Sequence, residues 1–377
     1  MRVRRRDAGT GSRSPWYGRI GFGLVALGFL VLAPATFSDF GLNLFTKYLC
    51  YAIIAVGIGL AWGQGGMLTL GQGVFFGLGG YGMGMYLKLQ AAGPGKVPDF
   101  MSWSGVEKLP LLWRPFQYGW VALPAVIIAP MAVAAALGFM VFRRRVRGAY
   151  FAILTQALAA AFVILLVGEQ GYTGGTNGLT NFNQAFGFDL ADPTNQRTLY
   201  VVTAVILGGV FLLARQLMAS RYGRLLVAVR DGEERVRFLG YNPTVIKVLA
   251  FTVSAGMAGL AGGLFVPVVG IISPALLGVV PSIEMVIWVA LGGRSSLVGP
   301  VLGALAVNYA KTSLSNRFPS GWLYLEGLLF VVVVGFAPMG LAGMIGYARS
   351  ALDRFRRSPA ASASDETQRL KDEVVPA

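Results

Sequence analysis

The 377-residue chain contains no histidine and one cysteine, Cys50, and only 13% of its residues are charged. Without histidine there is no imidazole for acid–base catalysis, and one cysteine allows neither an internal disulfide nor a Cys/His metal site. Cys50 stands inside an apolar run, which favours a small buried hydrophobe over a reactive thiol. We therefore expect no metal site, no bound cofactor and no redox relay.

Sequence signatures of nucleotide binding are also missing. The phosphate-loop pattern GxxxxGK[ST] does not occur, so the chain cannot power a process by itself through such a loop. The run GLGGYG at 77–82 is rich in glycine, but a dinucleotide loop needs a βαβ context that the surrounding sequence lacks. The chain is therefore not predicted to be an enzyme.

Hydrophobic residues make up 55% of the chain, and its mean hydropathy is +0.62. A soluble domain carries about 25% charged residues, so this composition predicts an all-α, polytopic membrane protein. The net charge of +15 could indicate nucleic-acid binding, but the basic residues stand in short clusters between apolar runs. Because cytoplasmic loops of membrane proteins are enriched in Lys and Arg, we expect membrane lipid and no nucleic acid as a partner.

The apolar runs predict about ten transmembrane helices, with both termini in the cytoplasm. This topology brings the dense basic clusters to one side, at residues 2–6, 143–147, 221–237 and 349–357. Residues 63–89 form a span so rich in glycine that it predicts close helix packing or a local break in the helix.

Three parts follow one another along the chain. Residues 1–19 are a basic cytoplasmic tail, 20–347 the transmembrane domain, and 348–377 a cytoplasmic tail whose composition is typical of disorder. The first apolar segment lacks a convincing small-residue cleavage site, so we expect it to be retained as a span and not removed as a signal peptide.

Residues 219–247, here named the charged loop, separate two apolar spans. Charges are costly in hydrocarbon, so this loop is expected to lie in water. Its excess of arginine predicts the cytoplasmic side of the membrane. The run AVRDGEERVRFLGYNP predicts a short amphipathic helix that Gly240 ends and Pro243 stops. Its predicted apolar stripe comprises Ala228, Val229, Val236 and Leu239, while Arg230, Glu233, Glu234 and Arg237 face water or a partner. Two interpretations stay open: a solvated loop, or a docking helix for a separate motor subunit.

Three charged residues, Glu284, Lys311 and Glu326, stand within or at the edge of apolar runs. Charges there could form the proton relay of a stand-alone proton-coupled secondary transporter. They could also sit near span ends, where their side chains reach the interface, and we favour this structural interpretation. A carrier of that class would give the charged loop no particular role.

The segment SRYGRLLVAVRDGEERVRFLGYNPTVIK resembles the coupling region of permease subunits in branched-chain amino acid (Liv-type) ABC importers. Further similar segments follow the family order between residues 40 and 345. They are LTLGQGVFFGLGGYGMGMYL, VRGAYFAILTQALA, GYTGGTNGLTNF and SIEMVIWVALGGRSSLVGPVLGALAVNYAKT. Within the family, urea-importer permeases are the most similar at five segments: LWRPF (112–116), GYTGGTNGLT (171–180), VRFLGYNP (236–243), IEMVIWVALGGR (283–294) and VNYAKT (307–312).

The resemblance implies a multi-pass permease of the bacterial plasma (inner) membrane. Its partners would be a second permease subunit, two cytoplasmic ATP-binding subunits and an extracytoplasmic substrate-binding protein. The implied cargo is urea, with branched-chain amino acids or short amides as the alternative. The residues implied in ATPase coupling are Gly223, Arg224, Ala228, Arg230, Glu233, Leu239 and Gly240.

Neutral polar residues are the predicted lining of the translocation path. They are Thr69, Gln72, Thr155 and Gln156, with Asn177 near the outer entrance. Amides and hydroxyls suit an uncharged cargo such as urea, but they also suit ordinary hydrogen bonding between membrane helices. An amino acid zwitterion would favour charged groups or helix ends at its site.

Overall fold

The computed structural model describes residues 36–318 except Pro94 and Ser295, with isolated positions between 321 and 331. This part of the chain is almost entirely helical, which confirms the predicted polytopic α-helical membrane protein. Several predictions fall outside the described residues: the tails at 1–19 and 348–377, nearly all of the first span at 20–37, most of the last span at 322–343, and Glu326.

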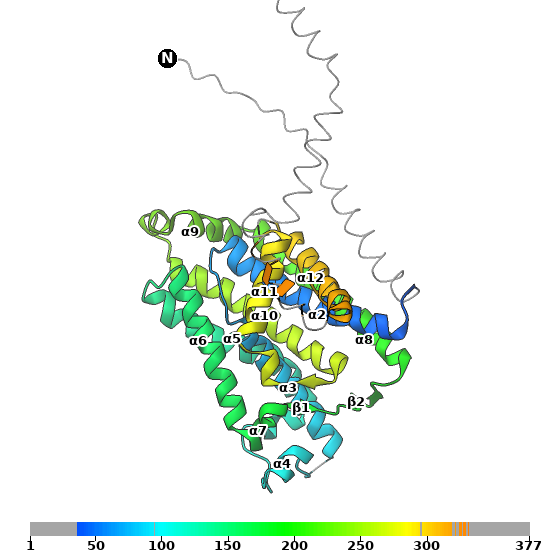
Figure 1. Ribbon diagram of the computed structural model, residues 1–377. Helices are drawn as coiled ribbons and strands as arrows, with labels where there is room; N and C mark the ends of the chain where they lie inside the picture. Colours follow the sequence, from blue (N-terminus) through cyan, green and yellow to red (C-terminus); the bar gives the residue numbers. More distant parts are fainter. Residues whose placement is uncertain are drawn as a thin grey trace, which may run out of the picture.

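Nine helices of more than one or two turns build the described structure, with α9 at one end and α4 and α7 at the opposite end (Figure 1). The nine are α2 (Asp39–Ile58), α3 (Gln72–Ala92), α5 (Gly119–Arg143), α6 (Ala149–Gly168), α8 (Pro193–Ala219), α9 (Arg221–Phe238), α10 (Pro243–Val269), α11 (Val279–Gly292) and α12 (Val298–Arg317). The short helices are the π-helix η1 (Gly59–Gln64), α4 (Asp99–Trp103), η2 (Arg114–Gln117), α7 (Gln170–Thr173), η3 (Gly175–Asn177) and η4 (Pro274–Leu276). Two antiparallel strand pairs join β1 (Leu179–Thr180) to β4 (Ile271–Ile272) and β2 (Gln184–Ala185) to β3 (Phe188–Asp189).

Six helical segments in the described part are long and apolar enough to cross a membrane. They are Asp39–Gln64, Gly119–Arg143, Ala149–Gly168, Pro193–Ala219, Pro243–Val269 and Pro274–Gly292. In their membrane-length stretches, 78% of the α2–η1 segment and 67% of α10 are buried, against 17% of α8. Helices α2 and α10 therefore form the centre of the bundle, while most of the α8 surface is available to lipid or another subunit. Helices α3 and α12 are not among the six, but they lie where further spans are expected.

The glycine-rich helix α3 packs directly against α10. A Cβ atom on Gly79 would lie 2.0 Å from the carbonyl oxygen of Gly259. A Cβ atom on Gly262 would lie 1.9 Å from the carbonyl oxygen of Phe76. Such distances are far below van der Waals contact, so only glycine permits this approach of the two backbones. The close packing predicted for residues 63–89 is confirmed.

The local break predicted for the same segment also occurs. After η1 the chain leaves helical geometry at residues 65–71, with Gly66 at φ +70°, and α3 begins only at Gln72. Helix α11 likewise begins inside the bundle, where the backbone N–H of Gly73 donates to Ser282 Oγ at 3.2 Å. The first turns of α3 and α11 therefore meet in the interior, an arrangement found at the solute sites of transporters with broken helices.

Candidate coupling surface and translocation path

Helix α9 crosses one end of the bundle (Figure 1) and is formed by most of the residues of the charged loop. Ser220 caps its start, because the hydroxyl accepts from the backbone N–H of Gly223 at 3.4 Å. The helix ends at Phe238, and Gly240 follows at φ +86°, a left-handed conformation that favours glycine. The predicted helix end at Gly240 is confirmed. Pro243 opens α10, because proline is favoured in a first helical turn.

A bend at Gly232 divides α9 into two arms. The backbone there is extended (φ −168°, ψ 74°), so one helical phase does not run through the whole segment. Val229 and Val236 are buried, as predicted. Two members of the predicted apolar stripe are wrong: Ala228 lies on a different face from its neighbour Val229 and is exposed, and Leu239 lies beyond the helix end and is 75% exposed.

Glu233 is the centre of an ion-pair network beside the bend. Its carboxylate pairs with Arg147 at 3.1 Å, with Arg237 at 3.2 Å and with Lys247. The side chain of Glu233 is 9% exposed, so the prediction that it faces water or a partner is wrong. Cations from three elements surround it, as a carboxylate with so little solvent requires. The network ties α9 to the α5–α6 loop and to the start of α10.

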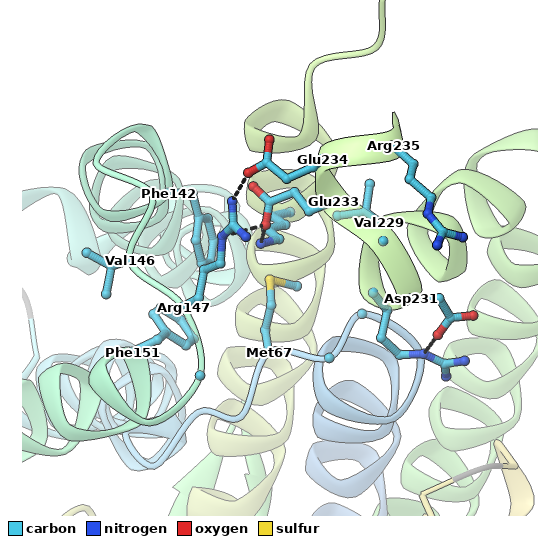
Figure 2. Close-up of a pocket in the computed structure, with 16 residues that line it drawn as sticks. Met67, Phe142, Val146, Arg147, Phe151, Val229, Asp231, Glu233, Glu234 and Arg235 are labelled. Carbon is cyan, nitrogen blue, oxygen red and sulfur yellow. Dashed lines mark hydrogen bonds and ion pairs between the residues drawn. The ribbon is translucent and has the colours of Figure 1, made fainter. Parts of the chain in front are cut away.

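Arg147 also donates to Glu234 Oε1 at 2.7 Å, and Figure 2 shows its guanidinium facing the carboxylates of both glutamates. The hydrogen bond from Arg147 lowers the pKa of Glu234 below its ordinary value and raises the pKa of Arg147. Because Glu234 is exposed, this pair orients Arg147 more than it stabilises the fold. An open cavity of about 440 Å³ lies between this network and the segment around Met67.

Arg230 links α9 to the break before α3. Its Nη1 donates to the carbonyl oxygen of Gly63, in η1, at 2.9 Å. Its Nε donates to Asp231 at 2.8 Å, and this hydrogen bond lowers the pKa of Asp231. A cation at the carbonyl end of a helix is favourable, so Arg230 caps η1 at the point where residues 65–71 begin. Helix α9 therefore contacts the broken segment directly.

The C-terminal tip of α9 exposes large apolar side chains. Phe238 is 90% exposed, Leu239 75% and Tyr241 50%. Apolar groups that gather on an otherwise charged surface are typical of a contact site. Phe238 and Tyr241 are absent from the sequence-based prediction, although the apolar FLGY run inside a charged loop is a signal that could have found them.

The other predicted coupling residues differ in burial. Arg224 is exposed on the first arm of α9, where a partner could reach it. Gly223 is buried, and a Cβ there would lie 2.3 Å from the carbonyl oxygen of Met218, so the α8–α9 turn requires glycine. A Cβ on Gly240 would meet no atom within 4 Å, so its positive φ is what favours glycine.

Three of the predicted path residues come together at the break before α3. Thr69, Gln72 and Thr155 are fully buried. Thr155 Oγ1 accepts from the backbone N–H of Leu70 at 3.0 Å. Gln72 Nε2 donates to Ser254 Oγ at 2.6 Å, while Gln72 Oε1 has no hydrogen-bond partner within the described part of the chain. The interior break is therefore lined by neutral hydrogen-bonding groups.

The remaining two predicted path residues lie apart from this cluster. Gln156 is half-buried on α6, and Asn177 is exposed in η3, close in sequence to α7 at the end opposite α9. The sequence prediction missed Ser254 and Ser282, which contact the first turn of α3. Their signal is weak, because a serine in a small-residue span also serves ordinary helix packing.

The charged residues of the apolar runs form a pair. Lys311 Nζ, from α12, lies 2.6 and 2.7 Å from the two carboxylate oxygens of Glu284, from α11. Both side chains are partly buried, and the sequence did not predict that they pair with each other. The pair lines a cavity of about 420 Å³ together with Lys47 and Trp288.

Comparison with known proteins gives a consistent result. Residues 40–337 match the family model described as branched-chain amino acid transport system / permease component. The high-affinity branched-chain amino acid transport system permease protein LivM of Salmonella typhimurium is 27% identical over 347 residues, covering 85% of this chain and 75% of LivM. LivH of Escherichia coli, a permease protein of the same description, is 23% identical over 306 residues, covering 78% and 91%.

One of the similar proteins belongs to a different import system. The autoinducer 2 import system permease protein LsrC of Salmonella paratyphi B is 31% identical over 133 residues, which are 33% of this chain and 38% of LsrC. No solved structure matches the chain.

Proposed function

Because the chain belongs to the family of permease components of branched-chain amino acid transport systems, we propose that α9 is the docking surface for the ATP-binding subunits of an importer. The chain itself is a multi-pass membrane permease subunit and not an enzyme. Force from ATP hydrolysis would therefore have to enter its membrane helices by contact. A charged helix that crosses the end of the bundle is suited to receive that force.

The attachments of α9 carry this proposal. Glu233 binds the α5–α6 loop through Arg147 and the start of α10 through Lys247. Arg230 binds the end of η1 through the carbonyl oxygen of Gly63. A displacement of α9 would therefore act on α5, α6, α10 and the break before α3 together. The exposed Phe238 and Leu239 offer the apolar contact that a partner groove would cover.

The proposed assembly has five parts. This permease pairs with a second permease subunit, two cytoplasmic ATP-binding subunits bind on the α9 side, and an extracytoplasmic substrate-binding protein docks at the opposite end. The low burial of α8 supports a neighbour in the membrane, although lipid can cover the same surface. The irregular segments around α4, α7 and β1 form the end that a binding protein would meet (Figure 1).

Urea is the proposed cargo. The segments LWRPF (112–116), VRFLGYNP (236–243) and VNYAKT (307–312) support it through their resemblance to urea-importer permeases. The neutral groups of Thr69, Gln72 and Ser254 at the break before α3 support it chemically, because urea is uncharged and both donates and accepts hydrogen bonds.

Branched-chain amino acids, or short amides, are the second candidate. LivM and LivH, which cover most of this chain, are permease proteins of high-affinity branched-chain amino acid transport. The pair of Glu284 and Lys311 also favours this cargo, because a zwitterion can bind groups of both charges.

Reconstitution tests the proposal. The complete five-part importer in proteoliposomes is expected to take up labelled urea when ATP is supplied on the side of the ATP-binding subunits. Uptake of labelled leucine is measured in parallel. The isolated chain with a pH gradient is expected to transport neither. ATP-independent uptake by the isolated chain would instead support a stand-alone proton-coupled carrier.

Phe238→Ser tests the docking surface within that system. It is expected to lower ATP-dependent uptake roughly tenfold or more and to weaken copurification of the ATP-binding subunits, because it removes a large apolar contact. Phe188→Ser is the matched control, because Phe188 is an aromatic residue of β3 that is 63% exposed. It should leave copurification of the ATP-binding subunits unchanged. Normal copurification and uptake by the Phe238 variant would refute α9 docking.

A further inference from the structure

A second cavity, of about 420 Å³, opens among α2, α11 and α12. This volume falls within the roughly 300–1,000 Å³ of small-molecule sites. Its walls come from the first half of α2 and the second half of α12. The opposite ends of these helices converge near η1, where Arg294, before α12, stacks on the Trp62 ring at 5.4 Å. The cavity therefore lies in the half of the bundle away from α9.

The cavity carries both signs of charge within a membrane-spanning part of the chain. Glu284 and Lys311 neutralise each other through contacts of 2.6 and 2.7 Å. Lys47 lines the same cavity, and the described ranges contain no ion-pair partner for it. Its ammonium lies 5.9 Å from the ring centroid of Tyr51. Because a charge between membrane helices is costly, it is expected to serve a function.

Trp288 supplies an independent observation. It lines the cavity, is 2% exposed, and its indole N–H has no hydrogen-bond partner among the described residues. Buried donors without an acceptor are rare, because each loses its bond to water without replacement. The ring of Trp288 packs on that of Tyr51, with centroids 4.8 Å apart, so the two aromatic rings and Lys47 form one wall.

We propose that this cavity binds the cargo, and that the cargo has amino N–H donors beside an oxygen acceptor. Lys47 and the indole N–H of Trp288 bind that oxygen, and the carboxylate of Glu284 accepts from the amino group while it keeps Lys311 as its counter-ion. Urea and α-amino acids share this chemistry. The inference rests on the proposed function and deepens it by locating the cargo.

The unequal charges of the cavity explain how one site can hold such a solute. The paired Glu284 and Lys311 present a dipole of no net charge, which binds neutral amides as well as amino groups. Lys47, which has no ion-pair partner among the described residues, adds an attraction for a carbonyl or carboxylate oxygen. Apolar side chains on the remaining wall, among them Phe76 and Phe265, exclude water and strengthen these hydrogen bonds.

Uptake kinetics of the complete importer test the site. Lys47→Met and Trp288→Phe are expected to raise the KM of the transported solute about tenfold or more, because each removes one hydrogen bond to it. Lys47→Arg keeps the cation and is expected to recover part of the loss. The matched control is Arg144→Met, which removes an exposed cation of the α5–α6 loop outside the cavity and should leave KM unchanged.

Uptake of labelled urea and uptake of labelled leucine are assayed separately. The solute whose KM rises in the variants is the one that binds in the cavity. The charge-swapped variant Glu284→Lys with Lys311→Glu separates binding from structure. If the pair only holds α11 to α12, the swapped variant should have the thermal stability and the KM of the unmodified protein. If the pair binds cargo, the swapped variant should keep the normal thermal stability but have a raised KM.

The failures of the two proposals are distinguishable. Absence of ATP-dependent uptake by the unmodified importer contradicts the proposed function. Normal uptake by that importer, with unchanged KM in both Lys47→Met and Trp288→Phe, contradicts the cavity alone. Restoration of KM by the charge swap would likewise assign Glu284 and Lys311 a structural role and remove them from the site.

Discussion

Glu233 and Lys47 show two ways of holding a charge where little water reaches. Glu233, in α9, is 9% exposed and is surrounded by Arg147, Arg237 and Lys247. Lys47, in the α2–α11–α12 cavity, has an aromatic ring beside it but no ion-pair partner within the described ranges. The first charge is fully compensated inside the protein. The second is left with bonding capacity.

This difference separates transmission from recognition. A network whose members bind one another gains from being intact. In the proposed mechanism, the Glu233 network moves as one piece and passes a displacement from α9 to the membrane helices. A site for a solute needs groups that stay unsatisfied until the solute arrives. We therefore expect variants of the Glu233 network to affect the coupling of ATP hydrolysis to uptake, and variants of the cavity to affect KM.

Glu233→Gln should give the largest effect. Removing this carboxylate leaves Arg147 and Lys247 without their shared partner, and breaking a buried ion pair typically costs about 3–5 kcal/mol. Because the network is partly open to a cavity, we expect a loss toward the lower end of that range. Thermal melting of the purified permease and ATP-driven uptake measure the change.

Glu234→Gln is the matched control for this experiment. Glu234 is the neighbouring residue and shares Arg147, but its side chain is 54% exposed, against 9% for Glu233. Its substitution should leave the melting temperature within error of the unmodified protein. Equal destabilisation by both variants would mean that burial does not distinguish these carboxylates, and the comparison with Lys47 would fail.

Arg230→Met should give a smaller and more selective effect. It removes the 2.9 Å bond to the carbonyl oxygen of Gly63 and so releases α9 from η1, while the Glu233 network remains. A hydrogen bond to a charged group is worth roughly 1.5–3 kcal/mol, and partial exposure of Arg230 reduces that. We expect uptake per ATP hydrolysed to fall severalfold with little change in melting temperature.

Arg235→Met is the control for Arg230, because Arg235 lies on the same helix and lines the same cavity as Arg230. It should leave uptake per ATP unchanged. If both variants uncouple transport equally, loss of basic surface is the cause, and the bond to Gly63 has no special part in coupling.

Local features of α9 were predictable from sequence, and its long-range contacts were not. The charged loop, its helix and the end at Gly240 follow from composition and turn chemistry. The outward orientation predicted for Glu233 assumes one continuous helix, which the bend at Gly232 interrupts. It also ignores Arg147, which is distant in sequence and reaches Glu233 only through the packing of the α5–α6 loop.

The membrane interior shows the same division. Glycine density predicted close packing or a local break, and the structure has both: α3 packs closely on α10, and residues 65–71 form a break. Glu284 and Lys311 stood out as charges in apolar runs, but their pairing depends on how α11 packs against α12. Lys47 received no prediction at all, because a single lysine near a span end is ordinary until the fold places it beside Trp288.

Changing the pH should give the smallest effect of all. The pKa of Glu234 is lowered from 4.5 by its hydrogen bond with Arg147, and that of Asp231 is lowered from 3.8 by Arg230. For a carboxylate whose folded-state pKa is depressed, the stabilising contribution is complete above the unfolded pKa and is lost only as pH falls through the folded value. The chain has no histidine to titrate near neutrality. Uptake per ATP hydrolysed should therefore stay constant between about pH 5 and 8. A steep change across that range, after normalisation to ATP hydrolysis, would point to a proton in the transport step. The Glu284–Lys311 pair would then act as a proton relay. In that case the Glu233 network would no longer be the main route by which energy enters the membrane helices.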